Sequence, residues 1–203
     1  MNNKFYKMKK TWIVLIIVGV LIVICYTSIK RTYNQMVTFD ESVTSQWAQV
    51  ENVFQRRLDL IPNLVNVVKG YADFEKETLT QVIEARARAT SVNINADNLN
   101  AASFRQFQEA QTGLSSALSR LMVVVERYPD LKANQNFLDL QAQLEGTENR
   151  ISVERRKFNE SARQYNTFIK QFPKRIYANI FNFESKAYFE AKEEAQEPPK
   201  VEF

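Results

Sequence analysis

Three pairs of neighbouring carboxylates are the side chains in this sequence best suited to catalysis or metal binding: Glu75/Glu77, Glu145/Glu148 and Glu193/Glu194. Carboxylates can bind divalent cations or act as general acid and base. The chain has no histidine, and its one cysteine, Cys25, lies in an apolar run. This composition excludes Ser-His-Asp and Cys-His triads, histidine-ligated zinc and the Glu-x-x-His di-iron site of helical bundles. Because Lys or Arg accompanies most of these carboxylates, we expect solvated helix faces, with no catalytic residue, metal site, cofactor or small-molecule substrate.

A second set of polar residues interrupts apolar seams. Arg57 and Glu154 each occupy an inward position of a helical pattern, with apolar residues one turn away. A lone buried charge is costly, so a partner is expected. The hypothesis is a buried or half-buried ionic layer that fixes helix register, built from Arg56 or Arg57, Glu148 or Glu154, and Arg155 or Arg156. The alternative is that these long side chains reach the surface.

Two asparagines follow aromatic residues seven positions apart, in Phe158-Asn159 and Tyr165-Asn166. The spacing places both on one helix face, where they either bond a neighbouring helix or form a binding surface. The candidate structural or interaction residues are Arg56, Arg57, Asp59, Pro62, Asn63, Glu148, Glu154, Arg155, Asn159, Tyr165 and Asn166. At the carboxyl end, Val201 and Phe203 suit strand addition into a PDZ-type groove, or else the tail folds back on its own domain.

The elements that position these residues are helices. Apolar residues recur at a spacing of three and four from Phe137 to Phe172, which predicts one helix over 131–172. The stretch from Phe137 to Phe172 alone is roughly 54 Å long as a helix. A single apolar seam of this length requires partner helices. Residues 99–128 give a second helix, and the Asn-rich stretch 91–100 gives a loop.

Residues 33–90 also carry the helical pattern, but Pro62 interrupts it. A proline inside a helix removes a hydrogen bond and clashes with the preceding turn. Either the chain turns here, giving helices over 33–61 and 63–90, or one long helix continuous with the preceding apolar run kinks at Pro62. The matching segment lengths favour the turn slightly.

After Pro173, the aromatic segment 174–192 packs on the bundle, makes a subunit contact or lies at the membrane surface. The polar, Pro-broken tail 193–203 is expected to be extended.

The amino-terminal region predicts a membrane anchor. Residues 1–10 form a basic head, and residues 11–29 carry no charge, so 11–31 is read as a transmembrane helix rather than a cleaved signal peptide. Six of the 27 basic residues fall in residues 1–31, which have no Asp or Glu, leaving 21 basic against 23 acidic residues beyond. The net charge of +4 is therefore no argument for nucleic-acid binding. The positive-inside rule predicts a cytoplasmic amino terminus.

The long motifs of the chain resemble the LemA family. They are Trp47, QRRLDLIPNLVNVVKGYADFEKETL (55–79), EARARA (84–89), the stretch 126–173 from ERYPDL to KQFP, and the closing PKVEF (199–203). The resemblance implies an all-α fold, in which an N-terminal transmembrane helix precedes an antiparallel up-and-down four-helix bundle over 33–192. It assigns no activity and no catalytic residues.

The function expected from these features is a non-enzymatic scaffold or adaptor of the bacterial cell envelope. It would sit in the inner membrane as a single-pass protein, with the bundle on the periplasmic side. Its partners would be the bilayer and either other proteins or further copies of itself, with no nucleic acid. The alternative is a sensory or regulatory membrane protein whose bundle binds a protein or peptide, which requires an unbroken helix from the span past Tyr33.

Overall fold

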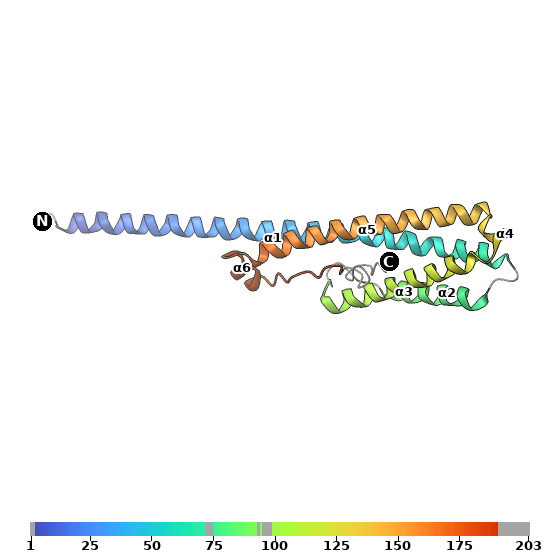
Figure 1. Cartoon of the computed structure of the whole chain (residues 1–203). Helices are drawn as coiled ribbons and strands as arrows, with labels where there is room; N and C mark the ends of the chain where they lie inside the picture. Colours follow the sequence, from blue (N-terminus) through green and yellow to red (C-terminus); the bar gives the residue numbers. More distant parts are fainter. Residues whose placement is uncertain (1–2, 72–74, 93, 95–98, 191–203) are drawn as a thin grey trace, which may run out of the picture. The chain divides into compact units, whose positions relative to one another are not determined.

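The computed structural model describes the backbone of residues 3–71, 75–92, 94 and 99–190, with side chains from Lys10 onward (Figure 1). Its helices are α1 (Asn3–Lys69), α2 (Lys76–Ser91), α3 (Ala101–Val125), α4 (Pro129–Lys132), α5 (Gln135–Lys170) and α6 (Lys174–Ile180). The described residues contain no strand. The predictions of an all-helical chain and of a long apolar helix at its amino terminus are confirmed.

The chain divides into two compact units. The first comprises Met1–Glu41 and Gln164–Ser185, and the second comprises Ser42–Arg163 and Lys186–Phe203. Both α1 and α5 contribute residues to each unit.

In the first unit, α1 contains an 18-residue window with a mean hydropathy of 2.8, none of which is buried inside the protein. Its large apolar side chains, from Trp12 to Tyr26, are exposed, and so is Cys25. By length and composition this helix can cross a membrane. Of the basic head predicted over 1–10, only the side chain of Lys10 falls among the described residues.

The remainder of the first unit packs aromatic side chains against α1. The rings of Phe39 and Phe168 lie 4.9 Å apart between centroids. After α6, the ring of Phe181 lies 5.0 Å and that of Phe183 lies 5.7 Å from the ring of Tyr33. These contacts hold α6 and the following turn beside α1 (Figure 1).

The second unit has an aliphatic core that five helices share. Its buried members are Leu58, Ile61, Leu64, Val65 and Val68 of α1; Leu79, Val82, Ala85 and Ala89 of α2; Leu114, Ala117, Leu121, Val124 and Val125 of α3; Leu131 of α4; and Phe137 and Leu144 of α5. Their spacing within each helix is that of one face. Burial of these faces is what holds the helices together.

The helix α1 continues through Pro62 to Lys69, so the slightly favoured alternative, separate helices over 33–61 and 63–90, is wrong, and the other alternative, one long helix continuous with the apolar run, agrees with the structure. Proline cannot donate to the carbonyl of Leu58, and Nε of Arg86 on α2 donates to that oxygen instead, at 3.0 Å. The buried seam also runs unbroken past the proline. The chain turns only at Gly70, whose N–H donates to the carbonyl of Val67 at 3.2 Å.

The helices α3 and α5 lie close to their predicted ranges, 99–128 and 131–172. The side chain of Asn100 caps α3, accepting from the N–H groups of Ala102 and Ser103. The long helix α5 begins later than predicted because Asn134 accepts from the N–H of Phe137 at 3.1 Å and starts it there. The segment predicted over 174–192 is helical only to Ile180, and its last two residues and the tail 193–203 lie outside the described residues.

Candidate functional site

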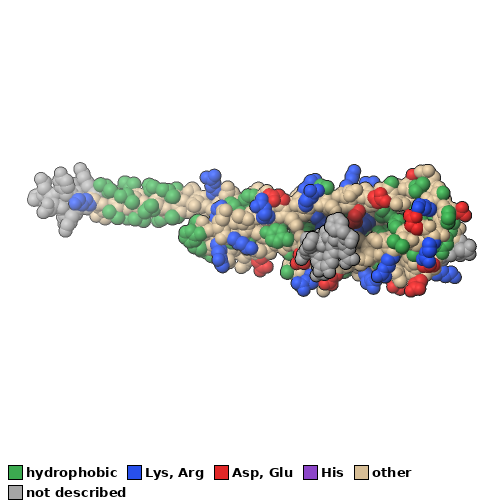
Figure 2. Space-filling view, viewed as in Figure 1, with side chains coloured by type: hydrophobic (Ala, Val, Ile, Leu, Met, Phe, Trp, Pro, Cys, Tyr) green, Lys and Arg blue, Asp and Glu red, His purple; other side chains and the backbone are tan. Residues whose placement is uncertain are grey.

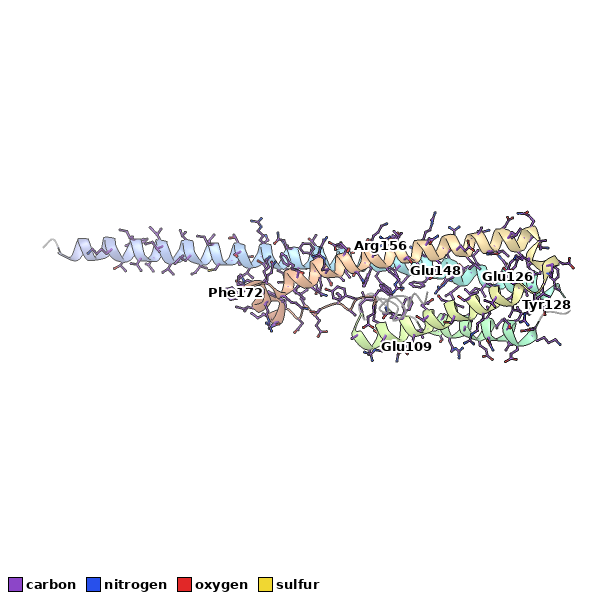
Figure 3. The ribbon with its side chains drawn as sticks, viewed as in Figure 1. Glu109, Glu126, Tyr128, Glu148, Arg156 and Phe172 are labelled. Atoms are coloured by element: carbon purple, nitrogen blue, oxygen red, sulfur yellow. The ribbon has the colours of Figure 1, made fainter. Side chains whose placement is uncertain are left out.

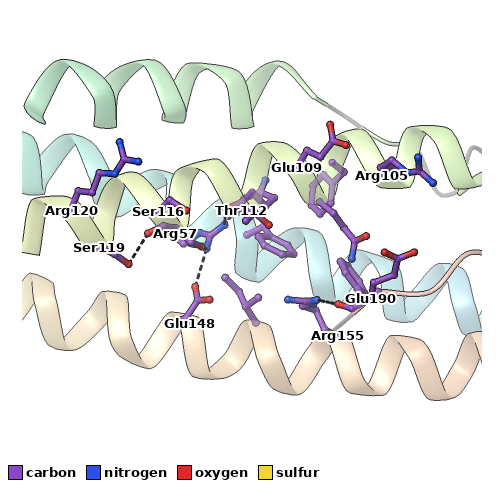
Figure 4. Close-up of a pocket in the computed structure, with 17 residues that line it drawn as sticks. Arg57, Arg105, Glu109, Thr112, Ser116, Ser119, Arg120, Glu148, Arg155 and Glu190 are labelled. Carbon is purple, nitrogen blue, oxygen red and sulfur yellow. Dashed lines mark hydrogen bonds and ion pairs between the residues drawn. The ribbon is translucent and has the colours of Figure 1, made fainter. Parts of the chain in front are cut away.

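An open groove of about 1030 Å³ lies in the second unit, bordered by α1, α3, α5 and the segment that ends at Glu190 (Figure 4). Its lining is Phe54, Arg57, Arg105, Phe107, Gln108, Glu109, Gln111, Thr112, Ser115, Ser116, Ser119, Arg120, Glu148, Ile151, Arg155, Phe189 and Glu190. Four arginines face three carboxylates, and hydroxyl and amide groups of α3 lie between them. This lining is polar and rich in hydrogen-bond donors.

Arg57 is the central residue of the groove floor, only 2% exposed. Its Nη1 donates to Oε2 of Glu148 at 2.8 Å and to Oγ of Ser115 at 2.9 Å. Its Nη2 donates to the side-chain oxygen of Gln111, and its Cζ lies 5.1 Å from the ring centroid of Phe54. Among the described residues, its Nε has no partner. Burial lowers the pKa of Arg57, and the attraction of Glu148 opposes that shift.

The structure brings together Arg57 and Glu148 from the predicted ionic layer. Glu154 lies elsewhere: it accepts from Nε2 of Gln46 at 2.7 Å and from Nζ of Lys157 at 2.9 Å. Its pKa is lowered, chiefly by the hydrogen bond from Lys157. Arg155 lines the groove one turn or more beyond Glu148. Burial lowers the pKa of Arg155, with Glu148 opposing the shift.

The remaining predicted residues lie outside the groove. The side chains of Arg56, Asp59, Pro62, Asn63 and Arg156 are exposed. Tyr165 and Asn166 are buried in the first unit, and burial raises the pKa of Tyr165, with Asp40 and Glu184 adding to the shift. Val201 and Phe203 lie outside the described residues, as do Glu193 and Glu194.

Asn159 acts on the backbone of its own chain rather than on a neighbouring helix. Its Nδ2 donates to the carbonyl of Phe189 at 2.9 Å, and its Oδ1 accepts from the N–H of the same residue at 2.8 Å. This two-way pairing satisfies both polar groups of an extended residue, as a neighbouring strand would. Asn166, seven residues later, lies in the other unit and has no part in this contact.

The side chain of Phe189 fills an aromatic cluster at the end of the groove. The cluster comprises Trp47, Phe54, Phe104, Phe107, Phe158 and Phe189. Phe189 lies 4.6 Å from Phe104 between ring centroids, and Cζ of Arg155 lies 4.8 Å from its ring. Nη2 of Arg155 also donates to the carbonyl of Glu190 at 2.8 Å. The groove therefore holds an extended segment by its backbone and by one aromatic side chain.

Sequence reasoning missed three of these groups. Gln111 occupies an inward position of α3 between Phe107 and Leu114, the same signal that identified Arg57. Ser115 and Phe189 carry no such signal, because their roles depend on contacts with residues far away in the sequence. Within the described residues, no three side chains of His, Cys, Asp or Glu lie close enough to hold a metal ion.

These features define a class of protein: in the part that the structure describes, it is a helical chain with one candidate membrane span and a groove that holds an extended aromatic segment. The sequence pattern of the LemA family matches residues 46–203, and the chain belongs to that family.

Two kinds of relative are similar to it. The magnetosome protein MamQ of Magnetospirillum gryphiswaldense is 27% identical over 191 residues, covering 85% of this chain and 70% of the relative. MamQ 2 of Paramagnetospirillum magneticum is 26% identical, covering 91% and 74%. Protein LemA of Metamycoplasma hominis is 24% identical, covering 79% and 69%.

Proposed function

We propose that this protein is a non-enzymatic adaptor, anchored in a membrane by the apolar part of α1, whose groove binds an extended segment of a partner protein. The exposed apolar window of α1 supports the anchor.

The observation that carries the proposal is the capture of Phe189. Asn159 pairs with both backbone groups of this residue, and the rings of Trp47, Phe54, Phe104 and Phe158 pack against its side chain. A groove that holds one extended segment in this way has the chemistry to hold another alongside it. The charged groups of Arg105 and Arg120, which are exposed along α3, favour a partner segment that carries acidic side chains.

We also propose how the helices are arranged and on which side of the membrane they lie. The helices α1, α2, α3 and α5 form an antiparallel up-and-down four-helix bundle, which is supported by the aliphatic core that they share. The basic head faces the cytoplasm and the bundle lies on the periplasmic side of a bacterial inner membrane, in accordance with the positive-inside rule.

A sensory role is the second candidate. It requires a helix without a break between the span and the bundle. The helix α1 is continuous through Thr32–Gln35, which favours this candidate because ligand binding would have a rigid element to act on.

Site-specific photo-cross-linking in cells tests the proposal. A photoreactive residue replaces Ser119 in the groove, and the matched control replaces Glu84, an exposed residue of α2 that does not line it. A binding groove predicts cross-links to one foreign protein from Ser119 and none to that protein from Glu84. The double variant Arg105→Glu/Arg120→Glu should weaken these cross-links because it repels an acidic segment.

Cross-links from Ser119 to the same chain alone would replace the adaptor with a homo-oligomer. Identical products from Ser119 and Glu84 would contradict a groove-specific partner. Insertion of two glycines after Tyr33 distinguishes the sensory candidate from the adaptor. The insertion should preserve cross-linking at Ser119 in both cases. It should abolish a cellular response only if the sensory candidate is correct.

A further inference from the structure

The first unit carries an exposed apolar patch. A helix that packs on a core normally buries its large apolar side chains, whereas here they are exposed. The patch comprises Phe172, which is 85% exposed, and the α6 residues Ile176 and Ile180, which are 49% and 64% exposed. The small residue Ala178 is the buried one in α6. Phe172 lies at the turn between α5 and α6 (Figure 3), and hydrophobic side chains gather at this corner of the molecule (Figure 2). The helix thus buries the small side chain of Ala178, while both of its isoleucines are exposed.

Basic residues surround this apolar patch. Lys170 and Arg175 are exposed beside it, and Lys174 lies with its Nζ 3.8 Å from the ring centroid of Phe168. On α1, the exposed residues Lys30 and Arg31 follow the apolar run directly. Apolar side chains flanked by Lys and Arg are typical of helices that lie in the plane of a membrane surface.

The contacts of the first unit set the height of the patch along α1. Tyr33 is four residues after Ile29, the last residue of the uncharged run, so it lies about 6 Å farther along the helix axis. The headgroup region of each leaflet is about 5–8 Å thick. The ring of Tyr33 therefore lies at headgroup level, as aromatic side chains at membrane boundaries prefer.

The contact of Phe181 with Tyr33 places α6 close to the same distance along α1. The ring of Phe181 contacts that of Tyr33 at 5.0 Å, and Phe181 directly follows Ile180, the last residue of α6. A helix of seven residues is about 10 Å long, so every residue of α6 lies within about 10 Å of that level. The exposed patch is then continuous with the membrane contact of the span.

We propose that α6 is a second membrane contact, which lies in the headgroup region of the leaflet next to Lys30 and inserts Phe172, Ile176 and Ile180 among the lipid chains. The ligand is the phospholipid surface: the apolar side chains contact acyl chains, and the basic residues contact lipid phosphate. This inference rests on the proposed membrane span. A second contact would fix the orientation of the first unit relative to the bilayer, which a single spanning helix does not do.

Environment-sensitive labels on the intact chain test this contact. With Cys25→Ser as the background, single cysteines replace Phe172, Ile176 or Ile180 and carry the fluorophore NBD. The protein is reconstituted in vesicles of phosphatidylcholine and phosphatidylglycerol, with and without lipids that carry a nitroxide quencher, placed near the headgroup to report the patch and midway along the acyl chain to report the span. Val123, which is 71% exposed on α3, is the matched control outside the patch, and Val18 is the control within the span.

Membrane contact predicts that nitroxide lipids quench about half of the emission at the three patch positions and little at Val123. Adding Ile176→Glu should shift the emission of the label at position 180 toward that in water, since a carboxylate resists insertion. Unquenched emission at all three patch positions, with Val18 quenched, would overturn the α6 contact and leave the span intact.

Two other results would also overturn the proposal. Blue-shifted emission at the patch that nitroxide lipids do not quench would show that a protein surface, or a second copy of this chain, covers it. Loss of quenching at Val18 as well would show that the span itself, and with it the proposed anchoring, is wrong.

Discussion

The two ends of the second unit use the same helices for different purposes. At one end, the inward positions of α1, α2 and α3 are aliphatic, and the helices close over a core of residues such as Ile61, Val82 and Leu121. At the other end, Arg57 and Gln111 take inward positions, and a groove lies open beside them. A few polar residues at core positions set this difference, since the helical spacing is the same at both ends.

The largest effect is expected in the aliphatic core. Leu121→Ala removes a fully buried side chain and should lower the free energy of unfolding by about 3 kcal/mol, through lost burial and the cavity left behind. Urea unfolding of the intact protein in mild detergent measures this change. Val123→Ala, an exposed site on the same helix, should change the free energy by less than about 0.5 kcal/mol. Equal losses at both sites would contradict the assigned core.

At the groove end, removing Glu148 should cost more unfolding free energy than removing its ion-pair partner Arg57. Glu148→Ala leaves the buried charge of Arg57 with neutral partners only, so we expect a loss of about 2 kcal/mol. Arg57→Met leaves a carboxylate that is 43% exposed and solvated, so its cost should be smaller. The exposed Glu145→Ala is the control. In the double variant Arg57→Met/Glu148→Ala, the loss of unfolding free energy should differ from the sum of the two single losses. In Arg57→Met/Glu154→Leu the two losses should add, because these residues do not contact each other.

The contacts of Phe189 should stabilise only the extended segment around it and not the whole second unit. Phe189→Ala should remove about 1–2 kcal/mol, because the extended segment can detach while the aliphatic core stays folded. Hydrogen exchange should show faster exchange at residues 187–190 and unchanged exchange in α2. Asn159→Ala should have the same pattern, and the half-exposed neighbour Tyr188→Ala should not. Exchange that rises equally throughout the unit would show that the segment is part of the core.

The bond from Arg86 to the carbonyl of Leu58 should contribute about 1 kcal/mol. Arg86→Met is expected to lose that amount. In a Pro62→Ala background the alanine N–H can bond the same carbonyl, so the further cost of Arg86→Met should fall. A double-mutant cycle of unfolding free energies measures the difference, and strict additivity would show that Arg86 does not compensate for the proline.

The smallest effect is expected at Tyr165. Its pKa is raised above the ordinary 10.0 by burial, so the folded state keeps the proton that the unfolded chain releases. The stabilisation is fully present below pH 10 and is lost as the pH rises above that value. Tyr165→Phe should reduce the fall in unfolding free energy between pH 9 and pH 11. An unchanged pH profile would contradict the burial of the hydroxyl group.

Much of the fold follows from local patterns. The apolar run, the start of α3 after Asn100 and the long α5 seam are all set by residues close together in the chain, and so were predicted correctly to within a few residues. At Pro62 the sequence left a turn and a continuous helix as alternatives, because the donor that replaces the missing N–H belongs to Arg86 on another helix. In the site, the inward position of Arg57 was evident, while the choice between Glu148 and Glu154 as its partner required the register between α1 and α5.

The sequence by itself determined the helical class of this protein, its candidate span and the family to which it belongs, because periodicity and composition act over short distances along the chain. Only the tertiary structure decided that Asn159 captures Phe189 thirty residues away and that α6 presents its large apolar side chains outward. Both depend on which helix faces are left uncovered when the chain packs, a result that no local pattern contains.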